Sequence, residues 1–545
     1  MLPTQAWALS EMDQGGIVGA IGVGHGKTLL DLLTPLVIPD CKVAMLLVMP
    51  GLRDQLLKSD LEFYGQHWKL PNIAGGRWLK PGRPMLHVVA FTELSGAKSS
   101  DLFKRIPADT IIVDEAHNLR NDTARRRRFL RYLKEAPKTR VFAWSGTLTS
   151  RSLRDYTHLS HHALKAGSPT PEHYPTVEEW CGALDPLTDR PKPKLAPGKL
   201  LAFCNPGERA TDGYRRRLND TRGVIATGDL QNCESDLIIS ERKLDVPEVV
   251  QKHLTALAET AERPDGEQLI DAMAVGMVAR QLSCGFFYRW RWPRKEPVPV
   301  IERWLAVRKS WHKELRERLK RPAEHMDSPL LLTKAAIRWE DGYVHIERDE
   351  HGNELSRRIV PPHTRRGPQP TWESEFWLQW KEVRESAQPE TEAVWLSDFM
   401  VADCARWLAD APGLLWYEFA DFGVRVARAA TAVHVGPGQE GSDRVLALQG
   451  TERAVISIRA HGTGKNLQQF HRNCVANPPS DGATWEQLLG RTHRQGQLAD
   501  EVTVDVYRHT DSMSQAVEKA RSLAGYIQGA FGATQKLVSK ATWRF

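Results

Sequence analysis

A short glycine-rich segment, Gly22-Val-Gly-His-Gly-Lys-Thr28, is the strongest constraint that the sequence places on the fold. It follows a β-rich run and precedes leucines at helical spacing, so it is expected to lead from a strand directly into a helix. Glycines let backbone N–H groups point at phosphate oxygens, and the helix N-terminus adds positive potential. Lys27 can reach the terminal phosphates, and the Thr28 hydroxyl can bind Mg²⁺. Although Ile21 stands where the strict pattern has its first glycine, the sequence predicts a phosphate-binding loop with Gly24, His25, Gly26, Lys27 and Thr28.

Short apolar runs alternate with helix-like segments in two separate parts of the chain. The runs are apolar throughout, as expected of strands covered on both faces, and leucines between them recur at helical spacing. This pattern is typical of a parallel sheet flanked by helices, so we expect an α/β fold with two such lobes. The expected strands cover residues 17–21, 43–49, 86–90, 110–113 and 140–144, and then 414–419, 431–435, 454–458 and 502–507.

The pattern divides the chain into three regions. Residues 1–240 are expected to form the first lobe, 241–395 a helical linker with an insertion, and 396–545 the second lobe. The insertion is unusual because 11 of the 18 tryptophans lie between residues 290 and 416, and residues 286–321 hold 12 Lys or Arg against 4 Glu. Interleaved Arg and Trp suit phosphate contacts and base stacking. They suit equally a small tryptophan core with solvated basic residues, and the sequence leaves both interpretations open.

The composition restricts the setting in which the chain works. Its 545 residues suffice for several domains, and a net charge of +7 suits a polyanionic partner. The seven cysteines include no Cys-x-x-Cys pair, which excludes a zinc clip of that kind and a dense disulfide framework. No apolar run reaches the roughly 18 residues that a membrane span needs. We therefore expect a protein of the reducing cytosol with no membrane partner.

Two adjacent carboxylates directly follow the expected strand 110–113, in the segment Asp114-Glu-Ala-His117. At a strand end they can divide the work of hydrolysis, because Asp114 can hold Mg²⁺ through water while Glu115 polarises the attacking water. Alone, the segment is also compatible with a solvated turn. Its position after a phosphate-binding loop favours the catalytic interpretation.

With these motifs in this order, the chain resembles superfamily 2 helicases and translocases, and the segment that begins at Asp114 matches their DEAH box. Members of that superfamily bind ATP and Mg²⁺ between two RecA-like lobes, and the resemblance spans almost the whole chain. It implies that Gln5 reads the adenine and that Thr28 and Asp114 bind Mg²⁺. It also implies that Lys27 and Glu115 act on the triphosphate.

The resemblance implies further residues outside the nucleotide site. His117, Ser145 and Thr147 would couple the nucleotide to the nucleic acid. Gly462-Thr-Gly-Lys465 imitates a second phosphate loop, but Asn466 stands where Ser or Thr would bind Mg²⁺, so we expect no second ATP site. The implied contacts with the nucleic-acid backbone are Pro50, Arg53, Thr92, Thr149, Thr463 and Asn466.

The segment 487–497 narrows the resemblance to one branch of the superfamily. It reads Gln487-Leu-Leu-Gly-Arg491-Thr-His-Arg494-Gln-Gly-Gln and is similar to a motif of the Snf, or chromatin-remodeller-like, branch. Arg491 and Arg494 are three residues apart and can project from one face of a helix. Across the cleft from the γ-phosphate, they would neutralise the charge that develops in the transition state.

The resemblance implies an ATP-dependent DNA helicase or translocase that moves along single-stranded, duplex or forked DNA. A role in replication, repair or fork remodelling would make replication or repair proteins its partners. The small size favours a bacterial or phage enzyme, in the cytoplasm of a bacterium or of an infected host cell. The alternatives are an RNA helicase and, from another class, an ATP-gated binding or scaffold protein that moves no strand. A packaging or restriction motor also stays open, although no nuclease carboxylate cluster stands out.

Overall fold

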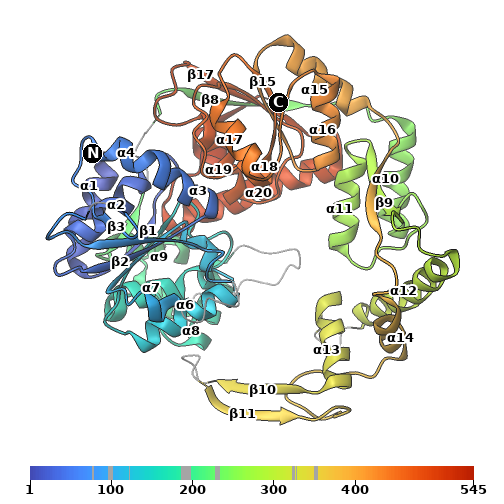
Figure 1. Ribbon diagram of the computed structural model, residues 1–545, viewed down its shortest axis with the longest axis horizontal. Helices are drawn as coiled ribbons and strands as arrows, with labels where there is room; N and C mark the ends of the chain where they lie inside the picture. The colour runs from blue at the N-terminus through green and yellow to red at the C-terminus, as the bar shows by residue number, and fades with distance from the viewer. Residues whose placement is uncertain are drawn as a thin grey trace.

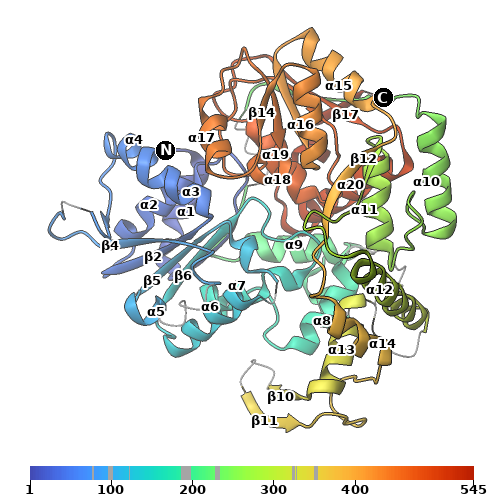
Figure 2. The same ribbon diagram turned by 45° about the vertical axis from the view of Figure 1, so that its right-hand side comes forward.

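Two large parallel sheets, each flanked by helices, form most of the structure (Figure 1). In both views the two sheets lie next to each other, and a green-to-yellow insertion extends away from them (Figure 2). The predicted α/β class with two parallel-sheet lobes is confirmed. The computed structural model describes residues 1–76, 79–95, 102–121, 123–185, 198–227, 233–321, 326, 328–348 and 354–544.

The first sheet has seven parallel strands in the order β3-β4-β2-β5-β6-β1-β7. Its strands are apolar throughout because both faces are buried: Ile111 and Val113 pack into one core cluster, and Ile112 between them packs into the other. Parallel strands end at one edge of the sheet, so the ends of β1, β5 and β6 lie close together. The strands are β1 (Ile17–Ala20), β2 (Val43–Val48), β3 (Asn72–Ile73), β4 (Met85–Ala90), β5 (Thr110–Asp114), β6 (Arg140–Ser145) and β7 (Val224–Ala226). The main helices are α1 (Pro3–Ser10), α2 (Lys27–Val37), α3 (Pro50–Gln55), α4 (Leu61–Gly65), α5 (Leu102–Arg105), α6 (Ala124–Glu135), α7 (Thr157–Leu164), α8 (Tyr174–Leu184) and α9 (Ala210–Asp220).

The second sheet also has seven parallel strands, in the order β14-β15-β13-β16-β17-β8-β18. The same alternation holds here, with Leu414 and Trp416 on one face and Leu415 and Tyr417 on the other. Strand β8 belongs to this sheet, which therefore draws on residues that precede position 240. The strands are β8 (Asp236–Arg242), β13 (Gly413–Tyr417), β14 (Val433–Val435), β15 (Arg453–Ser457), β16 (Arg472–Val475), β17 (Glu501–Tyr507) and β18 (Ala541–Arg544). Its helices include α15 (Phe399–Asp410), α16 (Ala420–Ala429), α17 (Gln439–Ala447), α18 (Ile458–His461), α19 (Gly482–Thr492) and α20 (Asp511–Phe531).

Helix α20 connects the two lobes. Ala520 and Ala524 pack into the core of the second sheet, whereas Phe531 at the end of the helix packs into the core of the first. The Tyr526 hydroxyl donates to Asp185 Oδ1 of the first lobe over 3.0 Å. The chain then returns to the second sheet, where β18 pairs with β8. The C-terminal segment thus fixes one lobe against the other.

The insertion is built around a core of tryptophans. Trp311, Trp372 and Trp377 are buried together, and the Arg318 guanidinium lies 3.7 Å from the ring centroid of Trp372. These three rings are therefore not exposed for base stacking, and the core is the interpretation that the structure supports for them. The elements here are α10 (Glu248–Thr260), α11 (Ala272–Leu282), β9 (Phe286–Arg291), α12 (Val298–Leu319), α13 (Pro329–Asp341), β10 (Tyr343–Arg348), β11 (Glu354–Val360), α14 (Glu375–Val383) and β12 (Glu390–Trp395).

The helices do not suit a membrane span. Among the described residues, none of them combines the length and the apolar character needed to cross a bilayer.

The tryptophan core yields a stability prediction. Replacing buried Trp311 by Ala should destabilise the insertion by about 3 to 5 kcal/mol, because the change leaves a large cavity among apolar side chains. Leu305, which is 40% exposed on the same helix, is the matched control, and Leu305→Ala should change little. Urea unfolding followed by tryptophan fluorescence measures both. Equal unfolding midpoints for the two variants would contradict this packing.

Candidate functional site

The glycine-rich segment forms a tight loop between β1 and the start of α2. Gly24 and Gly26 have φ angles of +89° and +69°, which residues with a Cβ rarely adopt. A Cβ on Gly26 would also lie 2.1 Å from Gln5 Nε2. Glycine is therefore favoured at Gly24 and required at Gly26, and the loop opens directly into the N-terminus of α2.

Helix α1 holds this loop from outside. The buried Gln5 side chain accepts from Leu2 N over 2.7 Å and donates to Gly26 O over 2.9 Å. Thr4 Oγ1 lies 3.0 Å from His25 Nδ1. Burial, assisted by the charges of Lys27 and Lys536, lowers the pKa of His25 to about 3, so this ring is neutral at physiological pH. Gln5 thus positions the loop through its hydrogen bond to Gly26.

Lys27 lies at the centre of the site. Its ammonium donates to Ile21 O over 3.2 Å and to Gly22 O over 3.3 Å, and it lies 3.7 Å from Glu115 Oε1. All three partners are acceptors, so the cation is stabilised locally and can exchange these oxygens for those of a phosphate.

The ends of β5 and β6 carry the second group of predicted residues. Ser145 Oγ donates to Glu115 Oε2 over 3.0 Å and accepts from Thr147 N over 3.1 Å. His117 Nδ1 lies 2.9 Å from Ser145 Oγ and 3.2 Å from Glu115 Oε2. The structure therefore brings His117, Ser145 and Thr147 into one hydrogen-bonded network around Glu115.

The pKa values of the two adjacent carboxylates are shifted in opposite directions. Burial raises the pKa of Asp114 to about 7, and the charge of Glu115 adds to this. Burial also opposes ionisation of Glu115, but Lys27 and the hydrogen bonds from His117 and Ser145 outweigh it and hold the pKa of Glu115 well below its usual range. Glu115 is therefore ionised, as a residue that accepts a proton must be.

Asp31 is a residue of this site that the sequence interpretation missed. It is buried on α2, and its Oδ1 accepts from Trp144 Nε1 over 3.0 Å. Burial and the charge of Asp114 raise its pKa well above the ordinary value. The signal was available in the sequence, because Asp31 is a lone carboxylate among the leucines of an otherwise apolar helix face.

On the second lobe, α19 presents a buried cation. The Arg491 side chain donates from Nε to Gln487 O over 2.7 Å, from Nη2 to Gln487 Oε1 over 3.0 Å and from Nη1 to Lys465 O over 3.0 Å. Arg491 is 3% exposed and forms no ion pair with any carboxylate in the described part of the chain. Burial, with the charge of Arg494 second, lowers its pKa to about 9.

Helix α19 packs directly on the glycine-rich loop. A Cβ on Gly490 would lie 2.6 Å from Val23 Cγ1, and a Cβ on Gly24 would lie 3.7 Å from Arg494 Cβ. The charge of Glu115 also acts on Arg491 across the same interface. The structure therefore brings residues of both lobes to one place, although they lie more than half the chain apart.

Gln487 Nε2 on α19 and Arg494 Nε just beyond it are buried polar atoms without partners within the described residues. Both are donors on or next to the helix that packs on the loop, and Arg494 lies beside Gly24, which suits an anionic ligand there. The described ranges contain no group of three or more His, Cys, Asp or Glu side chains that could hold a metal. Mg²⁺ is usually held by only one or two carboxylates together with phosphate oxygens, so a metal that binds with a nucleotide needs no such group.

Four of the six residues expected to contact nucleic acid are exposed. Pro50, Thr92, Thr463 and Asn466 are exposed, and Asn466 Oδ1 accepts from Arg494 Nη1. Arg53, on α3, forms a 2.9 Å ion pair with Glu93.

Thr149 differs from this group. It is 1% exposed, and its hydroxyl donates to Ser152 O over 2.9 Å, so in this arrangement its side chain stabilises a loop and is not open to a strand. The expectation of a direct contact through Thr149 is not met by its position.

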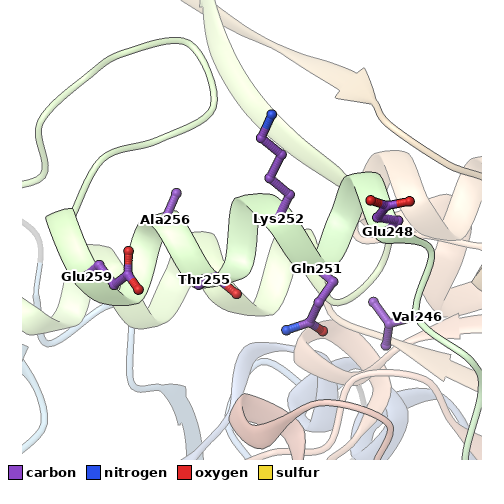
Figure 3. Close-up of a pocket in the computed structure, with 7 residues that line it drawn as sticks. All are labelled: Val246, Glu248, Gln251, Lys252, Thr255, Ala256 and Glu259. Carbon is purple, nitrogen blue, oxygen red and sulfur yellow. The ribbon is translucent and has the colours of Figure 1, made fainter.

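A concavity along α10 does not resemble a ligand-binding site. Its residues are also far in sequence from the glycine-rich loop. It has a volume of about 580 Å³. Figure 3 shows Lys252 and Gln251 extending in different directions from this helix, so its polar groups do not converge. The residues that line it are Val246, Glu248, Gln251, Lys252, Thr255, Ala256 and Glu259.

No protein-family model matches this chain, and no curated protein matches it. The residues and their geometry are therefore the basis for assigning a function.

The contact between α19 and the loop predicts a specific cross-link. A Cβ on Gly24 would lie 3.7 Å from Arg494 Cβ, within the range that a disulfide spans. The double variant Gly24→Cys, Arg494→Cys should therefore form a disulfide under mild oxidation, detected by peptide mass spectrometry. Gly15→Cys, Arg494→Cys is the matched control, because Gly15 has a similar φ of +85° and no atom within 4 Å of its Cβ position. Equal cross-linking of the two pairs would contradict the contact.

Proposed function

We propose that the chain is an ATP-driven translocase or helicase of the superfamily 2 type, with two RecA-like lobes, acting on DNA. The observation that carries the proposal is the approach of Arg491 and Arg494 to a loop that holds Lys27 beside Glu115. A lysine, a carboxylate and arginines from two lobes around one phosphate-binding loop suit phosphoryl transfer to water.

The residues would divide the reaction as follows. Lys27 would leave the carbonyl oxygens of Ile21 and Gly22 and bind the β- and γ-phosphates. Glu115 would orient the attacking water and accept its proton, for which its ionised state is suited. Bound Mg²⁺ would neutralise phosphate charge, held by Thr28 and Asp114. Arg491 and Arg494 would stabilise the charge that develops on the γ-phosphate.

The buried guanidinium of Arg491, which has hydrogen bonds but no counter-ion among the described residues, supports this role for α19. Burying a cation without a counter-ion is costly, and a bound triphosphate would supply the missing negative charge. The position of Arg491 is already fixed by the carbonyl oxygens of Gln487 and Lys465 and by the Gln487 side chain. Little reorganisation is then needed when charge develops, which is the condition for effective electrostatic catalysis.

Coupling to DNA would use the interface between the lobes. A Cβ on Gly464 would lie 2.6 Å from Leu52 Cδ2, so the segment with Thr463 and Asn466 packs on α3. Asn466 also accepts from Arg494, which connects the exposed segment to the nucleotide site. Opening and closing of this interface in each ATP cycle would move the backbone contacts stepwise along a strand.

Two substitutions test the hydrolytic site. Lys27→Ala should abolish ATP binding and turnover, because the phosphates lose their main cation. Glu115→Gln should lower turnover by about 10² to 10⁴ while ATP still binds, because the neutral amide cannot accept a proton. Steady-state phosphate release and equilibrium ATP binding measure both effects. Lys309→Ala, at an exposed position of α12 in the insertion, is the control and should retain ATP binding. Normal turnover in Glu115→Gln would refute the assignment.

The partner is tested by adding nucleic acids to the ATPase assay. Single-stranded, duplex or forked DNA should raise the rate, independently of sequence and with a steep loss at high salt, because the contacts are with phosphates. Stronger stimulation by RNA would identify an RNA helicase instead. No stimulation by either polymer would leave an ATP-gated binding protein as the better explanation.

A further inference from the structure

The C-terminal segment returns to the glycine-rich loop after α20. Thr534 N donates to Thr227 O over 3.3 Å, at the end of β7. Thr227 in turn accepts from Gly22 N through its Oγ1 over 2.9 Å. Phe531 and Ala533 are buried in the core of the first lobe. The chain just before residue 536 is therefore held at the end of β7, where Thr227 contacts both this segment and the glycine-rich loop.

The next residues are held by α19 of the second lobe. Lys536 N donates to Glu486 Oε2 over 2.7 Å, and Glu486 is buried one residue before Gln487. Leu537 packs into the core of the second lobe. Lys536 is thus fixed between the loop on one side and the arginine-bearing helix on the other.

The side chain of Lys536 is an additional cation at this place. Within the described residues its ammonium has no hydrogen bond or ion pair. Its charge nevertheless acts on the loop, because it contributes to the lowered pKa of His25, after burial and Lys27. The loop residue His25 therefore lies within the field of two lysines, Lys27 and Lys536, from opposite ends of the chain.

We propose that Lys536 is a phosphate-binding residue of the nucleotide site, supplied by the C-terminal segment. This inference rests on the proposed function, because it assigns Lys536 to the same ATP site. The ammonium is unpaired among the described residues and complements the phosphate charge. The backbone that carries it is hydrogen-bonded to α19 through Lys536 N and, two residues earlier, to Thr227 beside the loop through Thr534 N. No bond is made or broken by Lys536; it stabilises the bound triphosphate electrostatically.

A purely structural role makes a different prediction. In that case Lys536 would serve only to balance Glu486, whose pKa is raised by burial against the opposing charge of Lys536. Removing the carboxylate would then remove the need for the lysine. The two roles can be separated by combining substitutions at both positions.

The experiment measures equilibrium binding of Mg-ATP to the full chain by isothermal titration calorimetry. Lys536→Met should weaken binding by about five- to tenfold, the size expected for one partly solvated charge near a phosphate. Lys536→Arg should retain most of the affinity. Lys540→Met, at the other end of the helical turn Lys536–Lys540, is the matched control and should bind as the wild type does. Circular dichroism checks that each variant folds, and Lys536→Gln replaces Lys536→Met if the latter does not.

The same comparison in a Glu486→Gln background decides between the two roles. If Lys536→Met still weakens Mg-ATP binding in that background, phosphate binding by Lys536 is supported. If the effect of Lys536→Met disappears there, the proposal is overturned. Wild-type affinity of the single variant Lys536→Met would also overturn it. Lys27→Ala separates this outcome from failure of the proposed function. If Lys27→Ala abolishes binding but Lys536→Met does not weaken it, only the further inference fails. If the wild type shows no saturable ATP binding, the proposed function fails.

Discussion

The packing of α19 on the glycine-rich loop is the contact on which the arrangement of the site depends. It is close because Gly490 has no side chain, and even a Cβ at that position would collide with Val23. The contact places Arg491 in a buried position, where backbone carbonyl oxygens and the Gln487 side chain are its only hydrogen-bond partners among the described residues. A buried guanidinium without a counter-ion lowers the stability of the fold, and a bound anion would offset this cost. In the proposed function, a phosphate of the bound nucleotide would supply that anion.

The C-terminal segment explains how the two lobes keep the relative position that this contact requires. Helix α20 starts in the core of the second lobe and ends in the core of the first, and β18 then rejoins the second sheet. Tyr526 adds a hydrogen bond to Asp185 along the way. The same segment carries Lys536, so in our proposal one piece of chain both connects the lobes and adds a positive charge to the site.

Much of this could be predicted from the sequence, because the informative patterns are local. Apolar runs identified strands of both sheets, and the motifs at 22–28, 114–117 and 487–497 named side chains that the fold brings together. What remained hidden depends on contacts distant in sequence. The burial of Thr149 and the place of β8 in the second sheet follow from tertiary packing, as does the choice between the two interpretations of the tryptophans. Lys536 has no motif around it, so only the path of the folded chain shows its position.

The central claim is that one nucleotide is held by both lobes at once. Hydrogen–deuterium exchange with and without a non-hydrolysable ATP analogue and Mg²⁺ tests this most directly. We predict that amides of residues 22–28 and of residues 487–494 become protected together, at the same analogue concentration. Protection of the first segment without the second, or of neither, would contradict that claim.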